Sequence, residues 1–201
     1  MAKTSERKAE LISAAQRALA EHGSAVRLNQ VAQAAGVTSS AILYHYTGIE
    51  ELLVEANRAG MERFYNDRLN VIAVIIDPAE RLAHTISLGV PRTPEDEEVR
   101  LLCSLGGEAA RNTLYAVLLT SLYDRQVAMY QSILELGVSK GDFHLSQDSL
   151  TIARNLVALE DAYGYRIIAK HPTLDYHTAV ELILDYARLA TGHTLSQSTR
   201  S

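Results

Sequence analysis

The sequence predicts an all-α protein with a small N-terminal domain of three helices and a larger C-terminal helical bundle. Three observations support this class. Apolar residues recur at the i, i+3, i+4 spacing of a helix along almost the whole chain, and no stretch keeps the alternation of a strand. Glycine and proline fall between these stretches, where helices end. With 201 residues and 47% hydrophobic content, the chain is long enough for both parts to bury a core.

The clearest local pattern lies in residues 27–52. Apolar residues at helical spacing predict a short helix that ends at Gly36, because glycine tolerates the left-handed backbone of a helix end. Thr38 is placed to cap a second short helix that extends to about residue 46. Thr47 and Glu50 form the T-x-x-E pattern of a capping box, which predicts that a third helix follows directly. Two short helices joined by a glycine-containing turn are the helix-turn-helix pattern.

The second helix presents side chains that suit a DNA groove. Ser40, Leu43 and Tyr44 share one of its faces, and Ser39 lies one turn before Leu43. Hydroxyls can bind phosphates or base edges, and an apolar side chain can contact a thymine methyl group. The inward pair is expected to be Ile42 with Tyr46. The alternative is that Leu43 and Tyr44 are core residues of an ordinary helical corner that binds no DNA.

The charge is distributed unevenly along the chain. The net charge of −5 would not suit a DNA-binding protein as a whole. Residues 1–47, however, carry 5 basic and 3 acidic residues, whereas the remainder carries 14 basic and 21 acidic residues. A basic cluster at Lys3, Arg7 and Lys8 is either a solvated helix face or a set of phosphate contacts. The pattern is that of a small DNA-facing head on an acidic body, with binding that depends on salt.

The stretch AAGVTSSAILYHYTGIEELLVEA resembles the DNA-binding domain of TetR-type transcriptional regulators. Their usual pattern reads roughly AGVS-x-G-x-(L)-x-Y-(H/Y)-(F/Y)-x-S-K-E-x-L, and the resemblance covers about the first 55 residues without a gap. Ser40 replaces the usual glycine, and Ile49 replaces the lysine that supplies one phosphate contact in the family. Arg27 stands where a threonine cap is common and adds a positive charge. The candidate DNA-binding residues are Arg27, Thr38, Ser39, Ser40, Leu43, Tyr44, His45 and Lys8.

The rest of the chain is expected to form a second domain. We divide the sequence into a helix-turn-helix DNA-binding domain, residues 1–50, and an effector-binding and dimerisation domain, residues 51–201. The order of the C-terminal helices, especially ARNLVALEDAYGYRI at 153–167, resembles the BetI-like subgroup of the family's effector domains. That resemblance implies a topology and no particular ligand. Further helices are expected over residues 48–75, 79–88, 95–111, 112–138, 146–170 and 175–191.

A small-molecule pocket is expected in the second domain, where TetR-type proteins bind their effectors. Tyrosines repeat along residues 112–138, and amphipathic aromatic side chains with few polar groups suit a pocket inside a helical bundle. Any one of these tyrosines could instead be a core or surface residue whose hydroxyl is satisfied. The candidate ligand-binding residues are His84, Glu108, Arg111, Tyr115 and Tyr123.

A homodimer is expected because one helix-turn-helix of this size contacts few bases, so two must act together on a palindromic operator. The helices over 146–170 and 175–191 carry more apolar surface than one core-facing stripe requires. Pairing them with their symmetry mates would give an isologous four-helix interface, whereas the alternative is that both only cover the core of one chain. The candidate interface residues are Leu156, Leu159, Tyr163, Ile167, Val180, Ile183, Leu184 and Ala187.

No metal, cofactor or catalytic site is expected, because no H-E-x-x-H, phosphate-binding glycine loop or cysteine pair is present. A Cys103/His84 nucleophilic pair is conceivable, but nothing local supports it. The single cysteine, together with the lack of a signal segment or long apolar run, predicts a cytoplasmic protein without a membrane span.

The resulting hypothesis is a DNA-binding transcriptional regulator. It would be a repressor that binds double-stranded DNA at a palindromic operator as a homodimer and is released by a small-molecule effector. The alternative is a helical ligand-binding protein without specific operator recognition. The presence of Ile49 in place of the family's lysine and the small excess of basic residues over residues 1–47 favour it. An enzyme is the third hypothesis.

Overall fold

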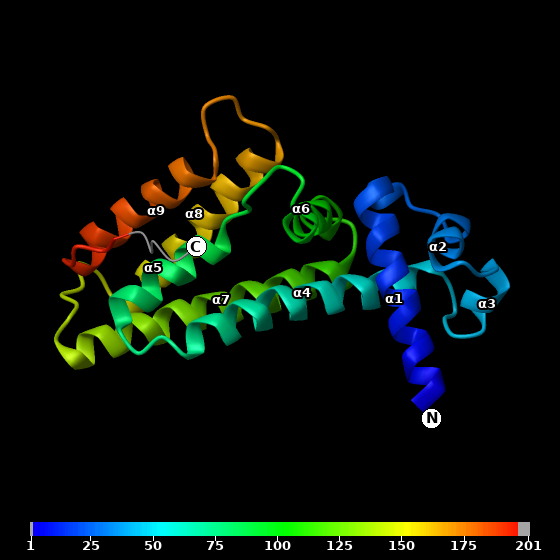
Figure 1. Ribbon diagram of the computed structural model, residues 1–201, viewed down its shortest axis with the longest axis horizontal. Helices are drawn as coiled ribbons and strands as arrows, with labels where there is room; N and C mark the ends of the chain where they lie inside the picture. Colours follow the sequence, from blue (N-terminus) through cyan, green and yellow to red (C-terminus); the bar gives the residue numbers. More distant parts are fainter. Residues whose placement is uncertain (1, 197–201) are drawn as a thin grey trace. The chain divides into compact units, whose positions relative to one another are not determined.

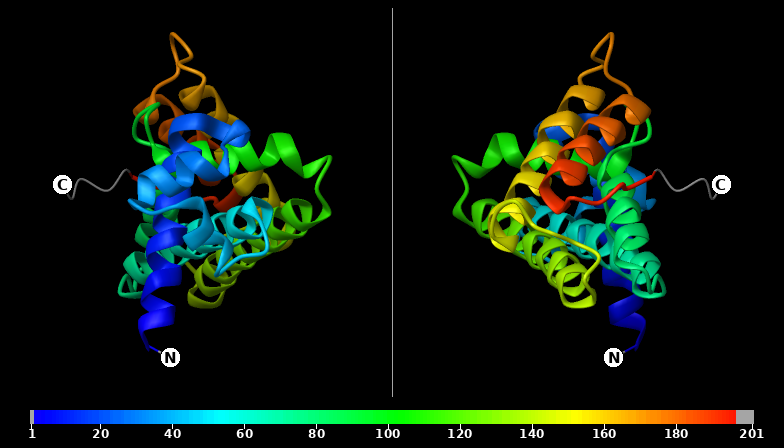
Figure 2. Two further views of the ribbon diagram at one scale, coloured as in Figure 1. Left: turned by 90° about the vertical axis from the view of Figure 1, so that its right-hand side faces the viewer. Right: turned by 90° about the vertical axis from the view of Figure 1, so that its left-hand side faces the viewer.

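The computed structural model describes residues 2–196, apart from the side chains of residues 2–4 and 24. Every regular element in this range is helical, so the predicted all-α class is confirmed (Figure 1, Figure 2). The helices are α1 (Ala2–His22), α2 (Leu28–Ala35), α3 (Ser39–Leu43), α4 (Ile49–Ala73), α5 (Pro78–Gly89), α6 (Glu97–Ala109), α7 (Thr113–Lys140), α8 (Ser149–Ile168) and α9 (Tyr176–Thr191), and a 3-10 turn, η1 (Gly23–Ala25), follows α1.

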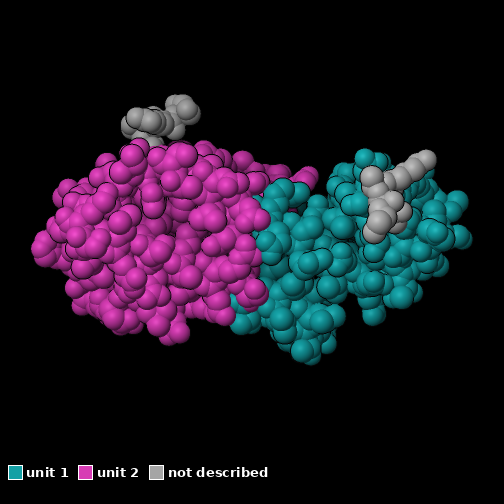
Figure 3. All heavy atoms as spheres, turned by 90° about the horizontal axis from the view of Figure 1, so that it is seen from below, with its two compact units in different colours: residues 1–64, 100–120 teal, residues 65–99, 121–201 magenta. Residues whose placement is uncertain are grey.

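The chain forms two compact units, which Figure 3 distinguishes by colour. Three helices contribute residues to both units: α4 and α7 begin in the first and continue into the second, and α6 begins in the second and continues into the first. The units are unit 1, residues 1–64 and 100–120, and unit 2, residues 65–99 and 121–201.

The core of unit 1 joins α1, α2, α3 and the first turns of α4. Leu11, Ile42 and Leu52 are fully buried within it. On α1, the Gln16 amide donates a hydrogen bond of 2.8 Å to the Ala56 carbonyl oxygen on α4. The start of α4 therefore packs with the head, although the sequence-based division placed it after the boundary at residue 50. The assignment of functions to the two parts stays a prediction.

The core of unit 2 is built from α5, α8, α9 and the later parts of α4 and α7. Figure 2 shows α8 and α9 lying side by side. Aspartates at positions 77, 148 and 175 cap α5, α8 and α9, and each carboxylate accepts a backbone N–H from three residues further on. Because such a cap satisfies an N–H group that the helix itself cannot pair, these aspartates fix where the three helices begin.

A buried polar network ties four helices of unit 2 together. Arg68 on α4 forms an ion pair with Glu160 on α8, with 2.5 Å between Nη2 and Oε1. The same guanidinium donates 3.0 Å to the Thr85 carbonyl oxygen on α5 and 2.8 Å to the Tyr130 hydroxyl on α7. Arg68 and Glu160 are only 3% and 2% exposed. Since a buried charge is stable only when it is paired, this network requires the four helices to keep their relative register.

The residues predicted for the dimer interface lie mostly inside this core, and this corrects the sequence analysis. Because a fully buried side chain has no surface left to contact a second chain, the apolar stripe assigned to dimerisation is the one that builds the monomer. Leu159 and Tyr163 are only half-buried. The buried candidates are Leu156, Ile167, Val180, Ile183, Leu184 and Ala187.

Candidate nucleic-acid interface

The turn between α2 and α3 has the geometry that the sequence predicts. Gly36 adopts a left-handed conformation, with φ 65° and ψ 35°, and Val37 donates its N–H over 2.9 Å to the Ala32 carbonyl oxygen. The Thr38 hydroxyl oxygen accepts the N–H of Ala41 at 3.3 Å, which confirms the predicted cap of α3. Glycine is favoured at position 36 because a side chain is strained in this backbone region.

One side of α3 is locked into the core and the other side is exposed. Ile42 and Tyr46 are 0% and 3% exposed, so the predicted inward pair is confirmed. Leu43 and Tyr44 are 49% and 84% exposed, so the alternative that they are core residues is wrong. Ser40 is also exposed. A large apolar or aromatic side chain held in solvent on a rigid helix is a candidate contact for another molecule.

The other candidate residues lie around this helix within unit 1. The Lys8 ammonium on α1 lies 5.1 Å from the centre of the Tyr46 ring, which places a positive charge beside the end of α3. The His45 ring meets Tyr44 edge-on, with 5.0 Å between ring centres. Arg27 is exposed at the N-cap of α2, and its backbone N–H donates to Gln30 Oε1 at 2.7 Å. Ser39 is half-buried at the start of α3 and Thr38 is exposed.

The third helix is capped by a different carboxylate from the one predicted. The Thr47 backbone N–H and hydroxyl donate to Glu51 Oε2 at 2.7 Å and 2.8 Å, whereas Glu50 takes no part. The reason is that α4 begins at Ile49, so the third helical position is Glu51. The hydrogen bonds from Thr47 lower the pKa of Glu51, and this carboxylate therefore stays ionised at neutral pH.

The charge asymmetry follows the units. Unit 1 contains 9 basic and 8 acidic residues, and unit 2 contains 10 basic and 16 acidic residues. The acidic excess thus belongs to unit 2, while unit 1 is close to neutral. Because phosphate contacts supply most of the affinity of a DNA-binding protein, a nearly neutral unit relies on where its few basic residues lie rather than on their number.

The five candidate ligand-binding residues are divided between the units. His84 and Tyr123 belong to unit 2, and the other three belong to unit 1. None of the five lines the cavity of about 550 Å³ in unit 1 or the cavity of about 410 Å³ in unit 2. The His84 Nδ1 lies 3.0 Å from the Glu80 carbonyl oxygen in its own helix. The roles of these five residues in binding an effector stay a prediction.

Neither a metal-binding cluster nor a membrane-spanning helix is present in the part of the chain that the structure describes. Within residues 2–196, no cluster of three or more histidine, cysteine, aspartate or glutamate residues could hold a metal ion. No helix in that range has both the length and the apolar character that crossing a bilayer requires.

The described residues define an all-α class of protein whose N-terminal helix-turn-helix presents an exposed face. Residues 11–56 match the family model described as bacterial regulatory proteins, tetR family. A search of curated proteins finds no significant match.

Solved structures with the same fold cover nearly the whole chain. A TetR transcription regulator from Haloarcula marismortui has a TM-score of 0.84 at 22% identity, over 93% of this chain and 99% of the other. A chain described as a transcriptional regulator from Saccharomonospora viridis, solved in complex with choline, has a TM-score of 0.83 at 23% identity, over 92% and 96%. The fatty acid degradation regulator FadR from Bacillus halodurans has a TM-score of 0.71 at 20% identity, over 91% and 94%. The chain therefore has the fold of TetR-type regulators, and the stretch that matches their family model contains its helix-turn-helix.

Proposed function

We propose that this chain is a TetR-type transcriptional regulator that binds a palindromic operator as a homodimer and acts as a repressor released by a small-molecule effector. The observation that carries the proposal is the face of α3. Leu43 and Tyr44 are held in solvent, while Ile42 and Tyr46 anchor the same short segment in the core of unit 1. A helix locked in this way can enter a major groove without losing conformational freedom on binding.

The contacts on DNA divide into two kinds. Ser40, Leu43 and Tyr44 would reach base edges or the phosphates that flank them, and this set would specify the sequence. Lys8 and Arg27 would contact phosphates, which adds affinity for every sequence alike. A regulator of this kind works where the chromosome lies, so we assign the protein to the cytoplasm.

Specific binding requires two heads, and we propose a revised surface for the dimer. The exposed sides of α8 and α9 carry small and apolar residues in line, with Ala158 and Ala162 on α8 and Leu182 and Leu189 on α9. Leu182 and Leu189 are 41% and 81% exposed. Small residues allow close approach of helices, and exposed leucines supply apolar area. This surface replaces the buried residues that the periodicity favoured, and it keeps the same pair of helices.

The proposed effector is a small molecule. One relative of this fold was solved with choline, and the sequence of α8 resembles the BetI-like subgroup. We take the choline complex of that relative as support for a small ligand in this chain, whereas the resemblance of α8 concerns topology alone. The coupling between ligand and DNA must be reciprocal, so an effector that releases DNA is itself bound less tightly by the DNA complex.

The test is a fluorescence anisotropy titration of the full chain with DNA from its own locus and with a scrambled duplex. Wild type should prefer the locus DNA. Tyr44→Ala should lose on the order of tenfold to a hundredfold in affinity for that DNA only, the size of one good base contact. Ser40→Glu should lose more, because a carboxylate would face phosphates. Ile76→Ala is the matched control, since Ile76 is 80% exposed in unit 2. Wild-type affinity in Tyr44→Ala would remove α3 from the proposal.

The dimer is tested by sedimentation equilibrium of a Leu182→Glu, Leu189→Glu double variant. Both side chains are exposed, so the variant should fold as wild type by circular dichroism and should sediment as a monomer. Val138→Glu is the control, because Val138 is 47% exposed on α7. A monomeric wild-type protein at micromolar concentration would refute the dimer.

The alternative is a ligand-binding protein that recognises no particular operator. The near-neutral charge of unit 1 and the presence of Ile49 favour it. It predicts equal affinity for locus and scrambled DNA in the anisotropy titration. It also predicts that moderate salt abolishes binding to both.

A further inference from the structure

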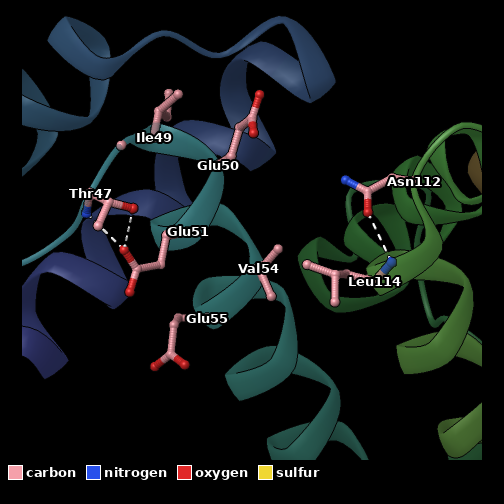
Figure 4. A pocket seen from close by; sticks show the side chains of 9 residues that line it. Thr47, Ile49, Glu50, Glu51, Val54, Glu55, Asn112 and Leu114 are labelled. Carbon is pink, nitrogen blue, oxygen red and sulfur yellow. Dashed lines mark hydrogen bonds between the residues drawn. The ribbon is translucent and has the colours of Figure 1, made fainter.

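A cavity of about 550 Å³ lies in unit 1, between the first turns of α4 and the beginning of α7 (Figure 4). Its α4 side includes Glu50, Val54 and Glu55, and its other side includes Asn112 and Leu114. The site is lined within unit 1 alone, and the helix-turn-helix continues directly into it through Thr47. Its size suits a small organic molecule.

The charged groups that line this cavity are all carboxylates. Glu50, Glu51 and Glu55 come from successive turns of α4, and no lysine or arginine is among the lining residues. The field of the helix N-terminus stabilises Glu50 and Glu51 in the first turn, which explains those two without a ligand. It does not explain Glu55, which lies beyond that turn and pairs with Arg58, at 2.8 Å on the helix surface. The lining therefore carries one carboxylate more than the field of the helix N-terminus stabilises.

The opposite wall combines a polar residue, Asn112, with an exposed apolar residue, Leu114. Leu114 at the start of α7 is 59% exposed, and Val117 one turn later is 60% exposed. In Figure 4 the side chains of Leu114 and Val54 extend towards each other across the cavity. Apolar surface facing carboxylates is complementary to a molecule that has both an apolar group and a positive charge.

A buried polar group one turn along α4 from Val54, outside the residues that line the cavity, lacks a hydrogen-bond donor. Asn57 follows Val54 by three residues on α4 and is 2% exposed; its amide nitrogen donates to the Leu53 carbonyl oxygen, but its Oδ1 has no partner. Tyr115, which follows Leu114, lies next to it. Burial raises the pKa of Tyr115, a hydrogen bond with Asn57 opposes that shift, and the charges of Glu50 and Glu108 add to it. The surroundings thus hold an excess of negative charge and one buried acceptor without a donor.

We propose that this cavity binds an organic cation, an ammonium group joined to an apolar or aromatic group, and that the bound cation competes with Thr47 for Glu51. The ammonium would be placed among the carboxylates, and the apolar group would lie against Leu114 and Val54. Glu51 already accepts two hydrogen bonds from Thr47, so a cation that engages this carboxylate weakens the link between α4 and the segment that follows α3. The effect on DNA rests on the proposed function, whereas cation binding does not.

The probe is phenethylammonium, and the matched neutral molecule is 2-phenylethanol. Isothermal titration of the full chain without DNA should show binding of the cation and at least about tenfold weaker binding of the alcohol. Glu50→Gln together with Glu55→Gln should weaken cation binding by about fivefold or more, because two partly exposed carboxylates lose their charge. The control is Glu21→Gln, an exposed carboxylate on α1. Equal binding of the alcohol, or unchanged binding by the double variant, overturns the site.

The link to Thr47 is tested separately with the anisotropy titration. Phenethylammonium should lower wild-type affinity for the locus DNA, and the double variant should need about fivefold more of it for the same loss of affinity. Cation binding with unchanged DNA affinity overturns the competition for Glu51. A protein that binds the cation but prefers no DNA sequence refutes the proposed function and leaves the site in place.

Discussion

The two units differ in the buried polar groups at their centres. In unit 2, Arg68, Glu160 and Tyr130 join one network, in which the guanidinium bonds a carboxylate, a carbonyl oxygen and a hydroxyl. The one buried atom of unit 2 without a partner among the described residues, His193 Nδ1, lies after the last helix, away from this network in the sequence. In unit 1, the Tyr46 hydroxyl and the Asn57 Oδ1 are buried without partners. A fully paired buried network favours a single arrangement of several helices. A buried atom without a partner makes no hydrogen bond that would favour one arrangement over another.

This difference matches different tasks. Unit 2 resists rearrangement because any shift of α4, α5, α7 or α8 would separate a buried charge from its partner. Unit 1 is held mainly by apolar packing around short helices, and its unpaired atoms lie near the surfaces that we propose for DNA and for a cation. Regions of lower local stability are those where binding can change structure at small cost. The comparison can be tested by substitutions that alter one unit and have a counterpart in the other.

The largest effect is expected for Arg68→Met. It leaves the Glu160 carboxylate buried without a cation, so the free energy of unfolding should fall by about 3–5 kcal/mol. Urea unfolding at fixed protein concentration measures it, because a dimer makes stability depend on concentration. Lys170→Met is the control, since the Lys170–Glu95 pair of 3.2 Å is exposed and should contribute at most about 1 kcal/mol. Adding Glu160→Leu to Arg68→Met should restore much of the loss. If Arg68→Met and Lys170→Met lower the free energy of unfolding by similar amounts, burial is not what makes the Arg68–Glu160 pair important.

The next effect is expected for Gly89→Ala at the end of α5. A methyl group there would overlap the Glu160 carboxylate, which the ion pair holds in place. We expect a loss of about 1–3 kcal/mol, the usual cost of inserting a methyl group into a packed site. Gly106→Ala on α6 is the matched control, because no atom lies within 4 Å of the added methyl group. That variant should gain about 0.5–1 kcal/mol from helix propensity. If both variants gain stability, the space beside the Glu160 carboxylate accommodates a methyl group.

A smaller effect is expected for Lys8→Ala, and it concerns DNA rather than folding. Loss of one phosphate contact should reduce the slope of log affinity against log salt concentration by about 0.9, equally for locus and scrambled DNA. Lys140→Ala in unit 2 removes the same charge and should leave the slope unchanged; Lys140 donates to the Ile76 carbonyl oxygen at 3.0 Å. Equal slopes for wild type and Lys8→Ala would place Lys8 outside the DNA contact.

The helix-turn-helix could be predicted from the sequence because its signals are local. Apolar spacing, Gly36 at a left-handed position and Thr38 at a cap all act within a few residues of each other. The capping carboxylate was predicted one residue too early, because the choice between Glu50 and Glu51 depends on whether α4 begins at residue 48 or at residue 49.

The dimer surface and the buried network could not be predicted in this way. Both faces of α8 and α9 carry apolar residues, and only packing against α5 and α7 decides which face is buried. Arg68 and Glu160 are 92 residues apart, so no local pattern links them. One signal was present, because Glu160 follows Val157 by three residues on the buried stripe of α8. A charged residue at such a position predicts a buried partner, although it does not identify that partner.

The smallest effect is expected for the same substitution made once in each unit. Tyr46→Phe removes a buried hydroxyl that has no partner, so unit 1 should be unchanged or gain up to about 1 kcal/mol. The Lys8 ammonium can still lie over the ring, because the aromatic face is kept. Tyr130→Phe removes a hydroxyl that accepts from Arg68 and donates to Glu160, so unit 2 should lose about 1–3 kcal/mol. Burial raises the pKa of both phenols, so both are neutral at pH 7 and the comparison involves no change of charge. Urea unfolding of the two variants side by side measures the difference. A loss at Tyr46 equal to the loss at Tyr130 would show that the Tyr46 hydroxyl is paired in solution, and the contrast between the units would then fail.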